Sequence, residues 1–127
     1  MAIEYSVSQN GQKIETFPKG VLSFKETFDY FDRLKNDNKI KESATEIVYF
    51  RDVTEFRISY LESDKIAKHY EKVKNTQKIS STIFVCETIQ AYTIGRMLQT
   101  FHEIINPDHK VVVVRSEAGI EKAINEL

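Results

Sequence analysis

STIFVCETIQAYTIGRMLQTFHEII, residues 81–105, is the stretch that decides the fold. Its first part, residues 82–86, is a continuous apolar run rich in β-branched and aromatic side chains, which is typical of a strand buried on both faces. Thr88 is placed to cap a following helix, and Asn106–Pro107 ends it. Apolar residues recur in this helix at the three- and four-residue spacing of a buried face, at Ile94, Met97, Leu98, Phe101 and Ile105. A strand that feeds a helix predicts an α/β sheet.

Two short segments near the start of the chain alternate apolar and polar residues. They are Ile3–Val7 and Lys13–Phe17, and the Asn10–Gly11 pair between them predicts an antiparallel hairpin. Pro18 and Gly20 end the hairpin. A capping box then predicts a helix, because Ser23 is followed three residues later by Glu26. The apolar stripe of this helix is formed by Phe24, Phe28, Phe31 and Leu34.

The remaining segments continue the alternation of strands and helices. Residues 46–53, EIVYFRDV, predict the third strand, which is followed by a loop over 54–59 and a helix over about Ser63–Asn75. Residues 110–115, KVVVVR, predict a last strand, and Ser116 is expected to cap a last helix. Strands that alternate with helices form largely parallel sheets. We therefore expect one α/β domain over residues 1–127, with a five-stranded mixed sheet, an opening β-hairpin and four helices.

Composition narrows the class of protein. A chain of 127 residues that is 41% apolar can bury one core, and a formal net charge of −1 gives no reason to expect a nucleic-acid partner. The single cysteine excludes an internal disulfide and a cysteine zinc site. The first residues lack the basic and apolar pattern of a signal peptide, and no apolar run approaches the ~20 residues that span a bilayer. We expect a cytoplasmic protein without an integral membrane segment.

Five motifs, taken in their order and spacing, resemble the SpoIIAA-like (STAS/SEC14-type) family of small bacterial proteins. They are Gly20-Val21-Leu22 before the first helix, Phe50-Arg51-Asp52-Val53-Thr54, Ala91–Met97 (AYTIGRM), Val113-Val114-Arg115-Ser116, and Ala123–Leu127 (AINEL). Ala91–Met97 is the most specific of them, and together they cover nearly the whole chain. The sequence departs from the family at Thr93, where relatives often carry glycine, and at Asn125–Glu126, which replace a pair ending in tryptophan.

This resemblance implies a STAS-like fold and a non-enzymatic regulatory or protein-interaction module, acting on a protein partner or on itself as a homodimer. The related lipid-carrier fold implies an alternative, a binder of a small apolar or anionic ligand, with Phe24, Phe28 and Phe31 as a wall of its cavity. In the anti-sigma-factor antagonists of the wider fold, a serine in an Asp-Ser-x-Gly setting is phosphorylated. Ser59 lies roughly at that place, but no aspartate precedes it and no glycine follows, which speaks against a phospho-switch.

Several polar residues follow strands and are expected at the carboxyl edge of the sheet, where open α/β sheets bind ligands: Asp52, Thr54, Cys86, Glu87 and Thr88. Cys86 precedes a helix N-terminus, which lowers a thiol pKa, so it is a candidate nucleophile. The simpler interpretation is a small buried strand residue. Asp52 and Glu87 are two carboxylates without a third ligand, so we predict no metal site and no cofactor.

Tyr92 and Arg96 are neighbours on one helical face because they lie four residues apart. Their face can bind a carboxylate, a phosphate or a partner chain, or Arg96 can form a structural ion pair with Glu87 or Asp52. The three histidines are scattered, and no hydrolase, P-loop, dinucleotide-binding or Cys-x-x-Cys motif is present. We therefore expect a binding function rather than catalysis, with an enzyme using Cys86 or the Asp52/Glu87 edge as the third possibility.

Overall fold

A five-stranded mixed sheet forms the centre of the molecule, as predicted. The structure, a computed structural model, describes residues 3–127. The strands are β1 (Glu4–Ser8), β2 (Lys13–Phe17), β4 (Thr45–Tyr49), β6 (Ser81–Val85) and β7 (Lys110–Val114). They lie in the order β1-β2-β4-β6-β7, with β1 antiparallel to β2 and the other pairs parallel. The opening hairpin is therefore one edge of the sheet, and β7 is the other.

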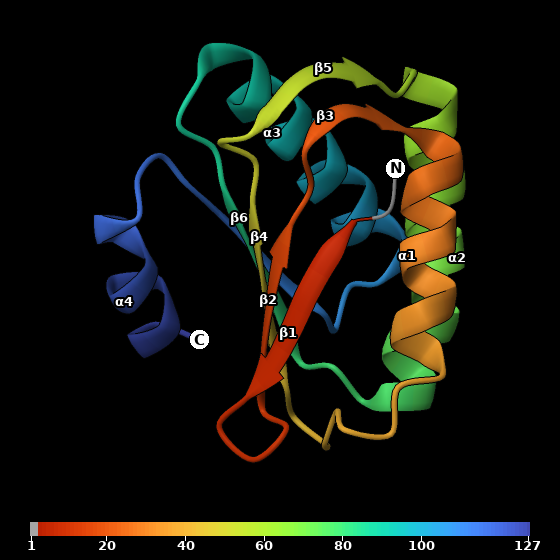
Figure 1. Cartoon of the computed structure of the whole chain (residues 1–127), viewed down its shortest axis with the longest axis vertical. Helices are drawn as coiled ribbons and strands as arrows, with labels where there is room; N and C mark the ends of the chain where they lie inside the picture. The colour runs from red at the N-terminus through yellow and green to blue at the C-terminus, as the bar shows by residue number, and fades with distance from the viewer. Residues whose placement is uncertain (1–2) are drawn as a thin grey trace.

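The four helices are divided unequally between the two faces of the sheet (Figure 1). They are α1 (Phe24–Lys35), α2 (Tyr60–Gln77), α3 (Ile89–Ile105) and α4 (Ala118–Asn125). Residues of α1, α2 and α3 share the larger apolar core with the sheet, whereas α4 contributes Ala123 and Ile120 to a smaller core on the opposite face. Among the described residues, no helix is both long and apolar enough to cross a membrane.

Side-chain caps begin three of the helices. Ser23 and Thr88 cap α1 and α3, as predicted. Ser59 caps α2 and forms a capping box with Glu62, so this helix begins three residues before the predicted Ser63. The prediction that Ser116 caps the last helix was wrong, because the cap position is Glu117 and no described side chain bonds the free N–H groups there. Ser116 instead accepts a hydrogen bond from the Gly119 N–H through its backbone carbonyl.

A second sheet of two strands was not predicted. β3 (Gly20–Ser23) pairs in parallel with β5 (Val53–Arg57), where the sequence indicated a break and a loop. The predicted third strand, 46–53, is divided at a turn, because β4 ends at Tyr49 and the Val53 N–H bonds back to the Phe50 carbonyl. The Gly20 N–H donates to the Asp52 carbonyl, which holds the two segments together.

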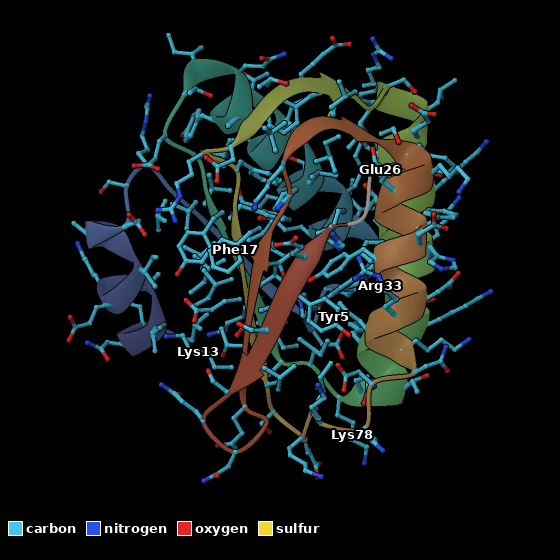
Figure 2. The ribbon with its side chains drawn as sticks, in the orientation of Figure 1. Tyr5, Lys13, Phe17, Glu26, Arg33 and Lys78 are labelled. Carbon is cyan, nitrogen blue, oxygen red and sulfur yellow. The ribbon has the colours of Figure 1, made fainter. Side chains whose placement is uncertain are left out.

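The hairpin is fastened to α1 by a polar contact at the sheet edge. Tyr5 on β1 and Arg33 on α1 lie close to each other (Figure 2), with the guanidinium carbon 5.4 Å from the ring centroid. The Tyr5 hydroxyl donates to Asp37 at 2.8 Å, and Arg33 donates to the backbone carbonyl of Ile3. These contacts fix the helix layer against the first strand.

The strand register decides which side chains face the three-helix layer. Glu46 pairs with Thr82 and Val48 pairs with Phe84, so these four side chains lie together beneath the helices. The alternate residues, Ile47, Tyr49, Ile83 and Val85, lie on the α4 face. The carboxyl group of Glu46 is thereby placed inside the larger core.

Candidate functional site

An aromatic and basic surface lies where α3 begins and β7 ends. Arg96 donates from Nη1 to the Tyr92 hydroxyl at 3.1 Å, and its guanidinium carbon lies 5.9 Å from the centroid of the same ring. Arg115, directly after β7, packs its guanidinium carbon 4.4 Å from that centroid. We call Tyr92, Arg96 and Arg115 the arginine face. The predicted proximity of Tyr92 and Arg96 is confirmed, and Arg115 is an addition that only the fold reveals.

The two arginines of this face lack the ion pairs that two other arginines of the protein form. Arg51 forms an ion pair with Glu117 at 3.2 Å, and Arg57 pairs with Glu55. Within residues 3–127, neither Arg96 nor Arg115 pairs with a carboxylate, so the suggested ion pair of Arg96 with Glu87 or Asp52 does not form. Arg96 and Arg115 are both exposed. The face therefore carries positive charge that the chain itself does not neutralise.

The residues predicted at the carboxyl edge of the sheet have mainly structural contacts. The Thr88 hydroxyl accepts a hydrogen bond from the Ala91 N–H at 3.1 Å, and the Asp52 carbonyl accepts one from Gly20. Thr54 lies on β5 and is exposed, as Glu87 is. In the part of the chain that the structure describes, no three His, Cys, Asp or Glu side chains gather as metal ligands. Binding by Asp52, Thr54, Glu87 and Thr88 stays a prediction.

Cys86 is buried at the end of β6, only 1% exposed, which fits the simpler interpretation. Burial raises the pKa of its thiol to about 12, so the helix N-terminus does not produce a thiolate at neutral pH. Gly95 of α3 packs directly on this sulfur, because a Cβ at Gly95 would lie 2.7 Å from Sγ. The Cys86–Gly95 pair sets the closeness of α3 to the sheet, and the geometry does not favour the thiol as a nucleophile.

Replacing Gly95 with alanine is expected to destabilise the protein by about 2 kcal/mol, because the overpacked contact outweighs alanine's helix preference of ~1 kcal/mol. In a Cys86→Ala background the same substitution should stabilise the protein by up to about 1 kcal/mol, since the sulfur that it meets is gone and alanine's helix preference remains. Urea unfolding of the two single variants and the double variant measures the coupling. An equal loss in both backgrounds would show that the sulfur is not the obstacle.

Ser59 is exposed at the start of α2, and its hydroxyl serves the helix cap. Its Oγ accepts from the Glu62 N–H at 3.1 Å, while the Glu62 carboxylate accepts from the Ser59 N–H at 2.8 Å. The side chain is reachable, but it already has a structural partner. A phospho-switch at this serine stays a prediction.

A buried polar cluster lies in the larger core, and the sequence did not indicate it. Glu46 accepts hydrogen bonds from the hydroxyls of Tyr30 at 2.5 Å, Tyr70 at 2.8 Å and Thr82 at 2.9 Å. All four side chains are at most 3% exposed. Burial raises the pKa of the Glu46 carboxyl, although the three donors act to lower it. The donors come from α1, α2 and β6, so the cluster joins three elements to β4.

Two buried histidines extend this cluster. His109 Nδ1 donates to the Ile79 carbonyl at 3.2 Å, so its Nε2 is an acceptor, and the single proton of the Thr82 hydroxyl is shared between Glu46 and His109 Nε2, which lies 2.8 Å away. The His102 ring lies edge-on to Tyr70, with centroids 5.2 Å apart. Burial lowers the pKa of His102 to about 3 and that of His109 to about 4. Both imidazoles are therefore neutral at pH 7.

A cavity of about 50 Å³ lies between the sheet and the helices and includes this cluster in its wall. Its polar lining comprises Thr16, Thr27, Tyr30, Glu46, Tyr70, Thr82 and His102. Of the three phenylalanines expected to form a wall, only Phe31 lines it. Phe24 and Phe28 instead contact each other with tilted rings, their centroids 4.2 Å apart, and Phe28 stacks on His69. Both are partly buried against the larger core without lining the cavity, so that part of the prediction was wrong.

Comparison with known proteins gives a fold but no sequence relative. No protein-family model matches the chain, and no curated protein matches its sequence. An uncharacterised protein of the DUF3478 family with a SpoIIAA-like fold, from Shewanella loihica, superposes with a TM-score of 0.55 at 10% identity, over 99% of this chain and 92% of that one. The anti-sigma factor antagonist SpoIIAA in its unphosphorylated form superposes with a TM-score of 0.52 at 8% identity, over 99% and 100%. The chain therefore has a SpoIIAA-like fold of the STAS type, as its motifs had suggested.

Proposed function

We propose that the protein is a non-enzymatic regulatory module that binds another protein chain through the arginine face. One of the similar folds is that of an anti-sigma factor antagonist, which supports a regulatory role by analogy only, since folds host many functions. The positive charge of the arginine face is the physical basis of the proposal, because it favours an acidic partner. The cytoplasmic location expected from the sequence is part of this proposal.

The observation that carries the proposal is the pair of guanidinium groups held against Tyr92, neither of which pairs with a carboxylate of the described residues. The ring orders both side chains in advance, which reduces the entropy lost when they bind. Guanidinium groups bind carboxylates through two parallel hydrogen bonds, and arginine and tyrosine are enriched at the centres of protein interfaces. The partner that fits is an acidic segment of another protein, or of a second copy of this chain.

The experiment compares the wild-type protein with an Arg96→Gln/Arg115→Gln variant. Native mass spectrometry of each protein, purified from cells that make it naturally, identifies the oligomer and any co-purified chain. The binding constant is then measured by calorimetry with that purified partner. We expect the double variant to bind at least tenfold more weakly, and the wild-type affinity to fall as salt is added, because the contact is charged and exposed.

Arg57→Gln is the matched control, since this arginine is also exposed but already pairs with Glu55 on β5. It should leave the affinity unchanged. A partner whose binding is insensitive to Arg96 and Arg115, or a monomer that retains no partner in any preparation, would refute the arginine face as the docking surface.

The alternative function, a carrier of a small molecule, is favoured by one observation, the internal cavity. At about 50 Å³ the cavity has room for about three or four water-sized groups, which is far too small for a lipid chain. The alternative is thus narrowed to small molecules. An enzyme that uses Cys86 has the least support, because burial keeps this thiol protonated.

A further inference from the structure

The cavity in the larger core has an apolar body and one polar wall. Apolar side chains from α2, α3 and the sheet line most of it, among them Ile66, Leu98 and Phe84. Glu46 and His102 are in its polar wall and are 2% and 4% exposed. The hydroxyls of Tyr30, Tyr70 and Thr82 are engaged with Glu46, Thr16 contacts the Tyr30 hydroxyl and Thr27 donates to the Ser23 carbonyl. His102 is therefore the donor in the wall whose hydrogen bonding remains to be accounted for.

Hydrogen bonds around Asn106 determine the tautomer of His102. The Asn106 amide nitrogen, Nδ2, lies 3.1 Å from the Ala67 carbonyl oxygen and 3.2 Å from His102 Nδ1. A flipped amide would bring two oxygens together at Ala67, so the contacts favour the orientation with Nδ2 at Ala67, although it leaves Asn106 Oδ1 buried and unpaired among the described residues. The amide N–H then donates to Nδ1, which must be the unprotonated nitrogen. Since the imidazole is neutral, its proton is on Nε2.

The Nε2–H group of His102 has no partner in the protein. From Ile3 to the C-terminus, no atom accepts a hydrogen bond from it, although the ring is 4% exposed and lines the cavity. Nε2 is not among the fully enclosed polar atoms that lack a partner, so the donor of this buried ring reaches accessible space, and the cavity that the ring lines is the space beside it. A donor on a buried ring that finds no acceptor is costly and uncommon in native proteins. A molecule in the cavity that offers an acceptor would remove this cost.

We propose that the cavity binds a small neutral molecule with a short apolar body and a hydroxyl or carbonyl oxygen that accepts a hydrogen bond from His102 Nε2. The volume limits the ligand to about four water-sized groups. A carboxylate or phosphate would lose its hydration in a mostly apolar space beside Glu46, and an ammonium ion has no acceptor to offer His102. This site is independent of the arginine face, which lies on the surface.

The binding test is NMR spectroscopy of the full chain with small probes of one size. The probes are 2-propanol and acetone, which distinguish a hydroxyl from a carbonyl oxygen, together with acetate, isopropylammonium and xenon. We expect saturable shifts of the Ile66 and Leu98 methyl signals with the first two probes and none with the two ions. The long-range proton–nitrogen spectrum of the imidazoles should show His102 protonated on Nε2, and this signal should move on saturation.

His102→Phe keeps an aromatic ring and removes the donor, and His69→Phe is its control because His69 does not line the cavity and contacts Asp32 at an exposed site. We expect the His102 variant to bind 2-propanol and acetone at least tenfold more weakly and to retain xenon, while the control binds as the wild type does. Should the variant not fold, the tautomer and titrations of the unaltered protein decide alone. An Nδ1–H tautomer, oxygen-bearing probes that bind no better than the ions, or unchanged affinity in a folded His102 variant would each overturn the proposal.

Discussion

Replacing Glu46 with alanine lowers the free energy of unfolding by roughly 3–5 kcal/mol at pH 7. Within residues 3–127, the substitution removes the one carboxyl group that accepts from Tyr30, Tyr70 and Thr82, and it leaves their buried hydroxyls short of an acceptor. It also opens space beside an existing cavity. The release of a buried acid offsets part of this loss, which is why the three bonds do not add fully. Urea unfolding followed by circular dichroism measures it.

Glu15→Ala is the matched control for Glu46→Ala, because Glu15 lies on the neighbouring strand and accepts one hydrogen bond, from Tyr49 at 2.8 Å, at a half-buried site. Its loss should cost about 1 kcal/mol or less. Glu46→Gln keeps an acceptor of the same size and should lie between the two. A loss at Glu46 no larger than that at Glu15 would mean that the buried cluster does not hold α1 and α2 to the sheet.

Stability is expected to fall as the pH is lowered from about 6.5 towards 4, and the buried histidines are the cause. In the unfolded chain each histidine binds a proton below its ordinary pKa of about 6.5. In the folded chain His102 has a pKa of about 3 and His109 a pKa of about 4, so protonation there needs a lower pH. Acid therefore favours the unfolded state, and each histidine contributes about 1.4 kcal/mol per pH unit within its window. For His102 the total is roughly 3–5 kcal/mol.

Glu46 acts in the opposite direction, so the histidine contribution must be isolated. Its raised pKa means that the folded state holds a proton that the unfolded chain releases above about pH 4.5, and stability from this group falls as the pH rises. The difference between the wild type and His102→Phe cancels the Glu46 contribution. Urea unfolding at pH 4, 5, 6 and 7 should show a slope smaller by about one proton in the variant. Parallel slopes would contradict a neutral, buried His102.

The regular elements followed from local patterns that the fold does not override. Some elements depend on residues only a few positions apart, so they can be recognised from the sequence alone. They are the hairpin, the strand at Ser81–Val85 and the caps at Ser23 and Thr88. The pairing of β3 with β5 could not be predicted in this way. Each strand is short, and the partner that stabilises it lies more than 30 residues away in the chain.

The buried cluster was missed for a different reason. Glutamate at the start of a strand is usually solvated, and the residues near Glu46 in the sequence do not indicate which side chains donate hydrogen bonds to it. One signal was present, because Glu46 shares its strand face with Val48 and Phe50, which are both apolar. Tyr30 and Tyr70 reach it only because α1 and α2 lie across the same face. Arg115 joined Tyr92 through a similar long-range contact between β7 and α3.

The strand order has a consequence for solubility. β7 is an edge strand with four consecutive valines, Val111–Val114, and an uncovered edge of this composition is a template for adding a strand of another chain. α3 covers one face of the sheet at β7, where the Gln99 side chain donates to the Val111 carbonyl at 2.8 Å. The eight-residue α4 shields the other side through Ile120 and Ala123. We expect fraying of this short helix to uncover Val112 and Val114, which pack in the same small core, and so to make the edge strand more prone to self-association.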